Sequence, residues 1–453
     1  MKTKEMMSRR NFLQLSAGAG LLAGLSRFEL EASAAQQDYK ALVCVFLFGG
    51  NDGHNVVVPL NPTQYTAYQQ ARGALTMPQN QLLPINDPAQ GAFGLHYGLP
   101  ELQSLYLQGK MTVVANAGML VRPTTYQEYQ NAFQLPTQLR SHSDQVSQMQ
   151  TGFPNTGGST GWGGRTADLM TANNLNATFP VSVSLNNSAL FCQGAVVQAA
   201  SLQPGNYLDQ NAMNFWPATA AQARAAAQQQ IVTADSGNAI VNAANKVLAD
   251  AVAINPILKA AGSGTPLTTV FPSTSLGNQL KDIARIINLR SQLGVGRQVF
   301  FCGLGGFDTH SSQAYNQWDL LKQVSQALGA FYSATAEMGV ADKVTSFTLS
   351  DFGRTLQPSG TGSDHGWGSH ILVLGGGVNG GKICGSFPNM LNYAAVGSGQ
   401  QDFADNRGTM LPRISLAQFG ATLAKWFGAA DSQLNGLFPT LPNFQVRDLG
   451  FMI

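Results

Sequence analysis

Five of the six histidines lie in short polar motifs that also contain an aspartate. Aspartate oxygens and neutral imidazole nitrogens together suit borderline divalent cations such as zinc, or manganese where oxygen ligands dominate. In extended backbone Asp308 and His310 would also point the same way, as two ligands of one ion must. Each motif alone fits an Asx turn or a surface histidine, but together they predict a shared metal site. The motifs are Gly49-Gly50-Asn51-Asp52-Gly53-His54, Ser141-His142-Ser143-Asp144, Gly306-Phe307-Asp308-Thr309-His310 and Asp364-His365-Gly366-Trp367-Gly368-Ser369-His370.

The elements that must position these motifs follow from the pattern of apolar residues. From about residue 40 the chain alternates short apolar runs with amphipathic stretches, which is typical of strands alternating with helices. Several runs are apolar on both faces, as a sheet covered by helices requires. The sequence therefore predicts an α/β fold with a mostly parallel central sheet. Its strands are expected at 41–48, 111–115, 181–185, 298–302, 344–349 and 371–374.

Two helices stand out by their apolar periodicity. Residues 318–338 carry one apolar stripe at steps of three and four, and residues 276–287 carry another after Ser275, a possible N-cap. The stretch 219–255 is instead dominated by Ala and Gln, which indicates long surface helices. We expect it to form part of a helical insertion at about 205–270 in a single domain spanning 35–453.

Three aspartates come directly after predicted strands. Asp52 follows 41–48, Asp308 follows 298–302 and Asp351 follows 344–349. Ligands of open α/β sheets bind beyond the carboxyl ends of the strands. The predicted metal site is therefore expected at this edge of the sheet.

The first 34 residues have the order of an export signal. Ser8-Arg9-Arg10-Asn11-Phe12-Leu13 places paired arginines before an apolar stretch at 15–25, and Ala32-Ser33-Ala34 supplies a small-residue cleavage site. The apolar stretch is too short for a stable membrane span, which needs about 20 residues. We expect a twin-arginine signal at 1–34, the twin-arginine translocase as a partner during export, and a periplasmic or secreted mature protein.

The composition of the mature chain excludes some classes of function. Apolar residues make up 44% of the sequence, enough for a large core, whereas charged residues make up only 11% and the net charge is +2. Without a basic cluster to follow a phosphate backbone, nucleic acid is not an expected partner. None of the four cysteines belongs to a C-x-x-C pair, which excludes a zinc knuckle or thioredoxin motif.

The order of the motifs resembles the domain of unknown function 1501 family, a group of twin-arginine exported bacterial proteins placed with the alkaline phosphatase and sulfatase superfamily. The resemblance covers nearly the whole chain and implies an alkaline phosphatase-like α/β fold with helices on both faces of the sheet. The segments that carry it are the export signal, Gly49-Gly50-Asn51-Asp52-Gly53, Arg140-Ser141-His142, Gly161-Trp162 with Arg165, Asp308 with His310, Ser350-Asp351-Phe352-Gly353-Arg354-Thr355 and Asp364-His365-Gly366 leading to Gly375-Gly376-Gly377.

The resemblance also implies a function. Enzymes of this superfamily use divalent metal to cleave phosphate or sulfate esters, so it implies an anionic ester substrate and one or two ions, zinc first and manganese, magnesium or calcium as alternatives. The implied metal ligands are Asp52, Asp308, His310 and Asp351, with a later ligand from Asp364, His365 or His370. The implied catalytic residues are Ser141 as nucleophile, with Ser143 and His142 as further candidates, and Arg354 or Arg140 as a clamp for the substrate anion.

The chain departs from the superfamily pattern in two places. Asp308 and His310 are two residues apart where four is usual, and Phe352 stands where an Asp-His pair is usual. A non-catalytic periplasmic binding or assembly protein that keeps the fold is therefore the alternative to the hydrolase. A serine esterase using Ser159 in Gly157-Gly158-Ser159-Thr160-Gly161 is a third hypothesis.

Overall fold

The computed structural model describes residues 38–155, 157–205, 215–238, 241–242, 245, 249, 266–393 and 402–453. The predicted export signal at 1–34 lies outside the described residues. So does much of the predicted insertion at 205–270, of which the described part includes helix α8 (Ala218–Thr233). Within the described residues, no helix combines the length and the apolar character that crossing a bilayer requires.

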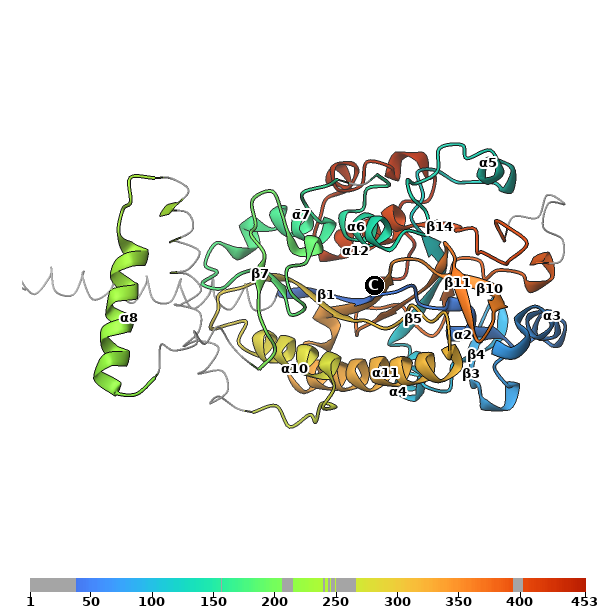
Figure 1. The fold of residues 1–453 in the computed structure, drawn as a ribbon, viewed down its shortest axis with the longest axis horizontal. Coiled ribbons are helices and arrows are strands. Elements are labelled where there is room, and N and C mark those ends of the chain that lie inside the picture. Colours follow the sequence, from blue (N-terminus) through green and yellow to red (C-terminus); the bar gives the residue numbers. More distant parts are fainter. Residues whose placement is uncertain are drawn as a thin grey trace, which may run out of the picture.

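A sheet of nine strands forms the centre of the molecule (Figure 1). Its order is β13-β5-β12-β9-β1-β8-β6-β7, with β14 beside β5. All the pairings are parallel except those of β12, which runs antiparallel to β9 and β5. The strands are β1 (Lys40–Leu47), β5 (Met111–Gly118), β6 (Ser182–Ser184), β7 (Ala200–Ser201), β8 (Arg297–Leu304), β9 (Val344–Ser350), β12 (Ser369–Leu374), β13 (Ile383–Cys384) and β14 (Ile414–Ser415).

Helices cover both faces of this sheet, and β1 shows why. Its side chains alternate between two cores: Val43 and Val45 belong to one, and Cys44 and Phe46 to the other. A strand buried on both faces needs apolar residues throughout. In Figure 1 one layer contains α4 (Pro100–Leu107), α10 (Ser275–Asn288) and α11 (Gln313–Glu337), and the other contains α6 (His142–Thr151), α7 (Trp162–Asp168) and α12 (Leu416–Phe427).

The predicted α/β fold with a mostly parallel sheet is confirmed, and all six predicted strands are present. Both predicted helices are present as α10 and α11. The N-cap of α10 is Thr274 and not Ser275, because the Thr274 hydroxyl accepts the amide hydrogen of Gly277 at 3.1 Å.

Smaller elements surround the carboxyl edge of the sheet. The hairpin β10 (Arg354–Ser359) and β11 (Gly362–His365) leads into β12. Because β12 is antiparallel to its neighbours, its amino end lies at the edge where β1, β8 and β9 end. The remaining elements are α2 (Gly53–Val56), α3 (Pro62–Arg72), α5 (Tyr126–Gln130), α13 (Leu434–Leu437) and an antiparallel sheet of β2 (Val57–Pro59), β4 (Gly91–Leu95) and β3 (Leu83–Asp87).

Candidate metal centre

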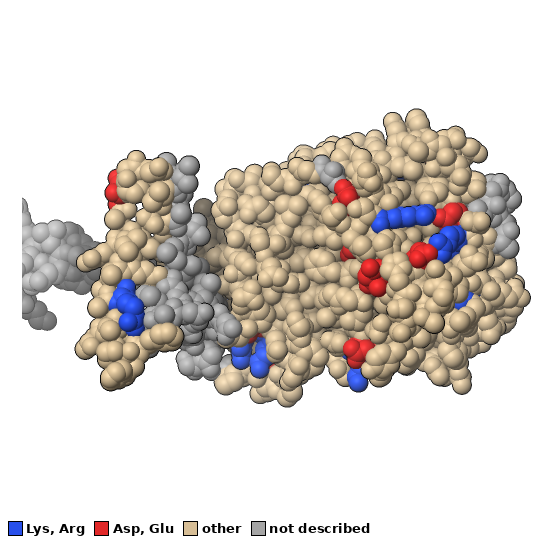
Figure 2. Space-filling model, viewed as in Figure 1, with Lys and Arg blue, Asp and Glu red and all other residues tan. Residues whose placement is uncertain are grey.

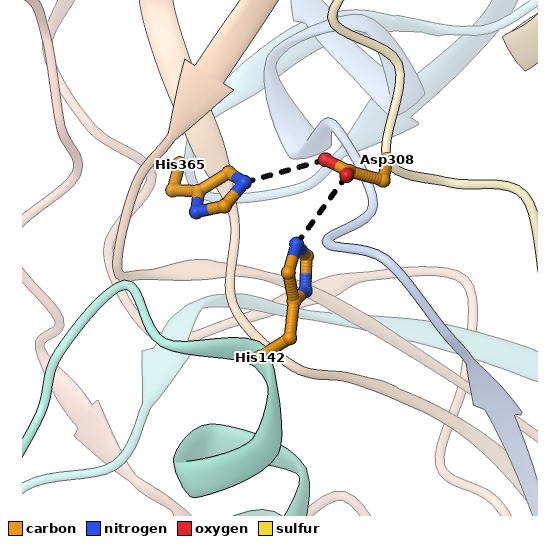
Figure 3. Close-up of side chains that lie close together, drawn as sticks. All are labelled: His142, Asp308 and His365. Atoms are coloured by element: carbon orange, nitrogen blue, oxygen red, sulfur yellow. Dashed lines mark hydrogen bonds and ion pairs between the residues drawn. The ribbon is translucent and has the colours of Figure 1, made fainter.

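Three histidine rings surround the carboxylate of Asp308 beyond the carboxyl end of β8. The Nε2 atoms of His310 and His365 lie 3.0 and 3.3 Å from its Oδ1 atom. His142 Nε2 lies 3.5 Å from its Oδ2 atom. Figure 3 shows His142 and His365 pointing at Asp308 from different elements, and one ligand atom from each of these three residues lies within 4.8 Å of the others. We call His142, His310, His365 and Asp308 the candidate metal centre, or the metal centre for short.

Three segments distant in sequence meet at this centre. Asp308 and His310 lie in the loop after β8, His142 is the first residue of α6, and His365 ends β11. The hairpin approaches the loop closely at Gly362, where a Cβ atom would stand 2.2 Å from the carbonyl oxygen of Thr309. Only glycine allows this approach, so the hairpin sequence helps to place His365 beside His310.

Each histidine of the metal centre has an oxygen atom next to its Nδ1. A carbonyl oxygen can only accept, so the Nδ1 of His365 carries the hydrogen and a neutral ring presents a lone pair at Nε2. A carboxylate also faces Nδ1 of each of the other two rings, and a hydrogen placed there leaves Nε2 free to bind a metal. With Nδ1 protonated, all three rings would present Nε2 to an ion at Asp308, which is the arrangement of metal-binding histidines. The Nδ1 partners are Asp351 Oδ2 for His142 at 2.7 Å, Asp364 Oδ1 for His310 at 3.2 Å and the Arg140 carbonyl for His365 at 2.8 Å.

The spacing of these atoms fits a divalent ion. His310 Nε2 and His365 Nε2 are 3.0 Å apart, and together with Asp308 Oδ1 they form a triangle with sides of 3.0, 3.0 and 3.3 Å. Tetrahedral zinc with bonds of 2.0–2.1 Å separates its ligand atoms by about 3.3–3.4 Å. In addition, the Nε2 atom of His142 is buried and has no hydrogen-bond partner. The donor set of this chain is therefore suited to zinc.

Arg354 holds Asp308 in place. Its fully buried side chain donates to Asp308 Oδ1. Partial burial acts to raise the pKa of Asp308, but the hydrogen bond and charge of Arg354 outweigh it, so this pKa lies below its ordinary value. The prediction of Arg354 as a catalytic anion clamp is corrected, because its guanidinium has no exposed surface and is already bonded to the protein. The other acceptors are the carbonyls of Gly49, Gly50, Phe307 and Ser363.

Asp351 orients His142 and does not face the metal centre. Its side chain is only 2% exposed. One carboxylate oxygen accepts the amide hydrogen of Gly49 at 3.0 Å, and the other faces the His142 Nδ1. Burial raises the pKa of Asp351, whereas His142 opposes that rise. The structure therefore places Asp351, a predicted metal ligand, behind the His142 ring at Nδ1, and not among the ligand atoms of His142, Asp308 and His365 that lie within 4.8 Å of one another.

Asp364 contacts the Nδ1 atom of His310, as Asp351 contacts the Nδ1 atom of His142. One of its oxygens faces His310 Nδ1, and the other lies 2.5 Å from Nη2 of Arg407. Partial burial acts to raise the pKa of Asp364, but Arg407 outweighs it and the pKa lies below its ordinary value. Asp364 therefore orients His310 instead of facing the centre as a ligand.

Asp52 and His370 are not brought to the metal centre, which corrects two further predicted ligands. The buried Asp52 carboxylate pairs with Arg72 and accepts from Gln313, and its other oxygen caps α2. His370 lies on β12 within the sheet, where its Nδ1 accepts the amide hydrogen of Asn116 at 3.1 Å. Burial lowers the pKa of His370 to about 3, so this ring is neutral at physiological pH.

Ser141 immediately precedes His142 in the chain and is the N-cap residue of α6. Its hydroxyl donates to the Asp144 carboxylate and lies 3.3 Å from the Ser143 hydroxyl. Ser159, the serine of the esterase hypothesis, is exposed in a bend before α7 and does not follow a strand as a nucleophile elbow would.

Sequence reasoning placed His142 among the catalytic candidates and did not identify it as a metal ligand. It also missed Arg407 and the carbonyl of Arg140. The two-residue spacing of Asp308 and His310 was a usable signal. No sequence pattern joins Arg407 to Asp364 or Arg140 to His365, because these contacts arise only from the fold.

Comparison with known proteins gives one family and several distant likenesses. A family model described as protein of unknown function (DUF1501) matches residues 39–411. No curated protein matches the sequence. Among solved structures, the C-terminal periplasmic domain of EcEptC from Escherichia coli in complex with Zn is 11% identical, with 75% of this chain and 73% of that chain covered and a TM-score of 0.30.

Two other structures are similarly distant. The lipoteichoic acid synthase LtaP from Listeria monocytogenes is 9% identical over 76% of this chain and 67% of that chain, with a TM-score of 0.32. The PsFucS1 sulfatase from Pseudoalteromonas sp. is 9% identical over 84% of this chain and 77% of that chain, with a TM-score of 0.30. At these TM-scores the likenesses carry no argument about the centre, whose chemistry rests on its own geometry.

Proposed function

The chain belongs to the DUF1501 family of proteins of unknown function, and on that premise we propose that it is an exported, metal-dependent hydrolase of phosphate or sulfate esters. One observation carries the proposal: the Nε2 atoms of three histidines converge on the Asp308 carboxylate, and the Nδ1 atom of each faces an oxygen. Zinc suits these nitrogen and oxygen donors best.

The residues around the centre would divide the work of ester hydrolysis. A bound divalent ion supplies positive charge that stabilises the developing charge on the ester oxygens. Ser141 is the proposed nucleophile because it adjoins His142 and its hydroxyl already donates to Asp144. Attack by its oxygen would form an O–P or O–S bond to the serine and break the ester bond, with the Ser141 proton passing to Asp144 and the alcohol or phenol oxygen leaving and taking a proton from water. Water would then hydrolyse the seryl ester, releasing phosphate or sulfate and restoring the serine hydroxyl.

Metal analysis of the purified mature protein tests the proposal. We expect about one zinc ion per chain, because the described residues provide one histidine cluster of this kind. Chelation should abolish hydrolysis of aryl phosphate or aryl sulfate esters, and zinc should restore it. An Asp308→Asn variant should lose the metal, whereas Asp319→Asn, which changes an aspartate on α11, should retain it. A metal-free wild type without zinc-dependent hydrolysis would contradict the proposal.

A second candidate function is a binding or assembly protein that keeps a structural metal. It is favoured by Arg72, whose guanidinium pairs with Asp52 where the resemblance implies a metal ligand. Ser141→Ala separates the two functions. Loss of ester hydrolysis with zinc retained supports the hydrolase. A Ser141→Ala variant that loses no measurable function, while Asp308→Ala unfolds the protein, supports the binding or assembly protein.

A further inference from the structure

We propose that Arg140 and Arg407 form an anion-binding pair beside the metal centre, which holds a tetrahedral oxyanion such as the sulfate or phosphate group of a substrate. This inference rests on the proposed function, because it assigns the residues that recognise the substrate of the same site. The resemblance offered Arg354 or Arg140 for this role. The burial of Arg354 excludes it, and the structure adds Arg407 to Arg140.

The two arginines flank two adjacent residues of β11. The Arg407 guanidinium binds Asp364, whose other oxygen faces the ring of His310. The carbonyl of Arg140 faces Nδ1 of His365, the next residue along β11. Arg407 therefore contacts Asp364, the residue beside His310, and Arg140 contacts His365 itself.

A single carboxylate connects the two arginines. One oxygen of Asp405 lies 2.6 Å from Nη2 of Arg140, and the other accepts the amide hydrogen of Arg407 at 3.1 Å. Tyr129 also accepts a hydrogen bond from Nη2 of Arg140, at 2.9 Å. These contacts fix the loop that carries Arg407 relative to Arg140, so the spacing of the pair is set by the protein and not by the ligand.

Both guanidinium groups keep donors available to solvent. The Arg140 and Arg407 side chains are 40% and 38% exposed, and their ion pairs within the described residues use Nη2. A guanidinium has five N–H donors in a planar fork that suits sulfate and phosphate oxygens. Each arginine can therefore keep its carboxylate partner and still donate to an anion.

The backbone at Arg140 supports a specialised role. Its φ angle is 78°, in the left-handed region that residues with a side chain seldom adopt. This conformation accompanies the contact of its carbonyl with His365. Unfavourable backbone angles of this kind concentrate at functional sites.

Charge is scarce elsewhere on this face. Only 11% of the residues are charged. Figure 2 shows acidic and basic side chains gathered toward the end of the molecule where Figure 1 places β10 and β11. Arg72, another arginine bonded to a predicted site aspartate, is fully buried against Asp52 and out of reach of a ligand. Arg140 and Arg407 are instead partly exposed, and each contacts a residue at the metal centre or beside it.

Titration calorimetry with inorganic sulfate and inorganic phosphate tests the pair. The zinc-loaded protein is freed of excess zinc and compared with Arg407→Gln and Arg140→Gln, in which an amide can still donate to the carboxylate partner. We expect each substitution to weaken binding of the preferred anion roughly tenfold to hundredfold. Arg122→Gln is the matched control, because Arg122 is 35% exposed and lies 2.6 Å from Glu128.

Zinc affinity and thermal unfolding are also measured for each variant. These measurements separate a loss of anion binding from a loss of zinc binding or of folding. Unchanged zinc affinity with weakened anion binding supports the pair. Anion affinities equal to that of Arg122→Gln, or a wild type that binds neither anion, would overturn it. If the wild type binds no zinc, the proposed function fails by itself, and the same anion titrations of the metal-free protein still decide whether the two arginines recognise an oxyanion.

Discussion

At the scale of single residues, the buried Asp351 carboxylate acts through its neighbour His142. A carboxylate beside Nδ1 fixes the tautomer of the ring and makes Nε2 a stronger donor to a metal. Asp364 does the same for His310, and the carbonyl of Arg140 does so for His365. These contacts orient the three rings through residues of the chain itself.

Asp351→Asn tests this positioning role. The amide oxygen can still accept from His142, but the negative charge is lost, so we expect zinc affinity to fall about tenfold to hundredfold. Competition with a chromophoric chelator measures the change. Asp319→Asn should leave zinc affinity unaltered, since Asp319 bonds only to Gln323 among the described hydrogen bonds. Equal affinities in the two variants would show that Asp351 does not act through His142.

Arg354 and Arg407 each pair with an aspartate at or beside the centre, but Arg354 is buried and Arg407 is partly exposed. Replacing each arginine therefore compares the effect of burial on stability. Removing Arg354 leaves several buried carbonyls without their donor, so Arg354→Gln should lower the free energy of unfolding by about 1–3 kcal/mol or more. Arg407→Gln should change it by less than about 1 kcal/mol, because that pair is exposed. Urea unfolding measures both, and similar losses would contradict the assigned burial.

Asp308 and His310 could be proposed as metal ligands from the sequence, because they follow a strand and are two residues apart. It did not separate His365 from His370, since both lie in one histidine-containing stretch. Position in the fold makes the difference: His365 ends a hairpin at the edge of the sheet, whereas His370 is inside β12 and buried.

At the scale of elements, the reversed direction of β12 is the feature that assembles the centre. Apolar periodicity predicted six strands correctly, because burial on two faces demands continuous apolar runs. Periodicity carries no information about strand direction, so the antiparallel pairing of β12 with β9 and β5 was not predicted. That reversal brings the hairpin β10–β11 to the edge where β8 delivers Asp308.

The close approach of this hairpin to the β8 loop gives an element-scale prediction. In Gly362→Ala the new Cβ would meet the backbone of Thr309 and His310 at about 2.2 Å, so the hairpin or the loop must move. We expect reduced zinc affinity and a lower melting temperature. Gly305→Ala in the same loop is the control, because its Cβ would meet no atom within 4 Å. Zinc binding by Gly362→Ala equal to that of Gly305→Ala would show that the contact does not position His310.

At the scale of the whole molecule, the histidines divide into two populations. His142, His310 and His365 are partly exposed at the carboxyl edge of the sheet, whereas His54, His96 and His370 are buried. Burial lowers the pKa of the three buried rings, to about 4 for His54 and to about 3 for His96 and His370. Folding therefore requires these rings to be neutral, and the molecule should lose stability in acid even without any change at the metal centre.

His96 isolates this effect because it lies apart from the centre. It is 1% exposed, its ring stacks on Tyr97 with a centroid separation of 4.4 Å, and its Nδ1 accepts the amide hydrogen of Gly98 at 2.9 Å. Its pKa is about 3 in the folded chain against 6.5 ordinarily. Between these pH values the unfolded chain binds a proton that the folded chain lacks, so the contribution of this ring to stability is complete above pH 6.5 and falls as the pH drops toward 3.

An asparagine at position 96 places an amide oxygen where Nδ1 accepts, but it does not titrate. We expect His96→Asn to be less stable than the wild type at neutral pH, because the smaller side chain leaves a cavity. Between about pH 6 and 4 the deficit should shrink by about 1.4 kcal/mol per pH unit, the value for one proton. Urea unfolding at several pH values measures the deficit, and readings between pH 7.5 and 8.5 serve as the flat reference. A deficit that stays constant on acidification would show that His96 is already protonated, or able to become so, inside the folded chain.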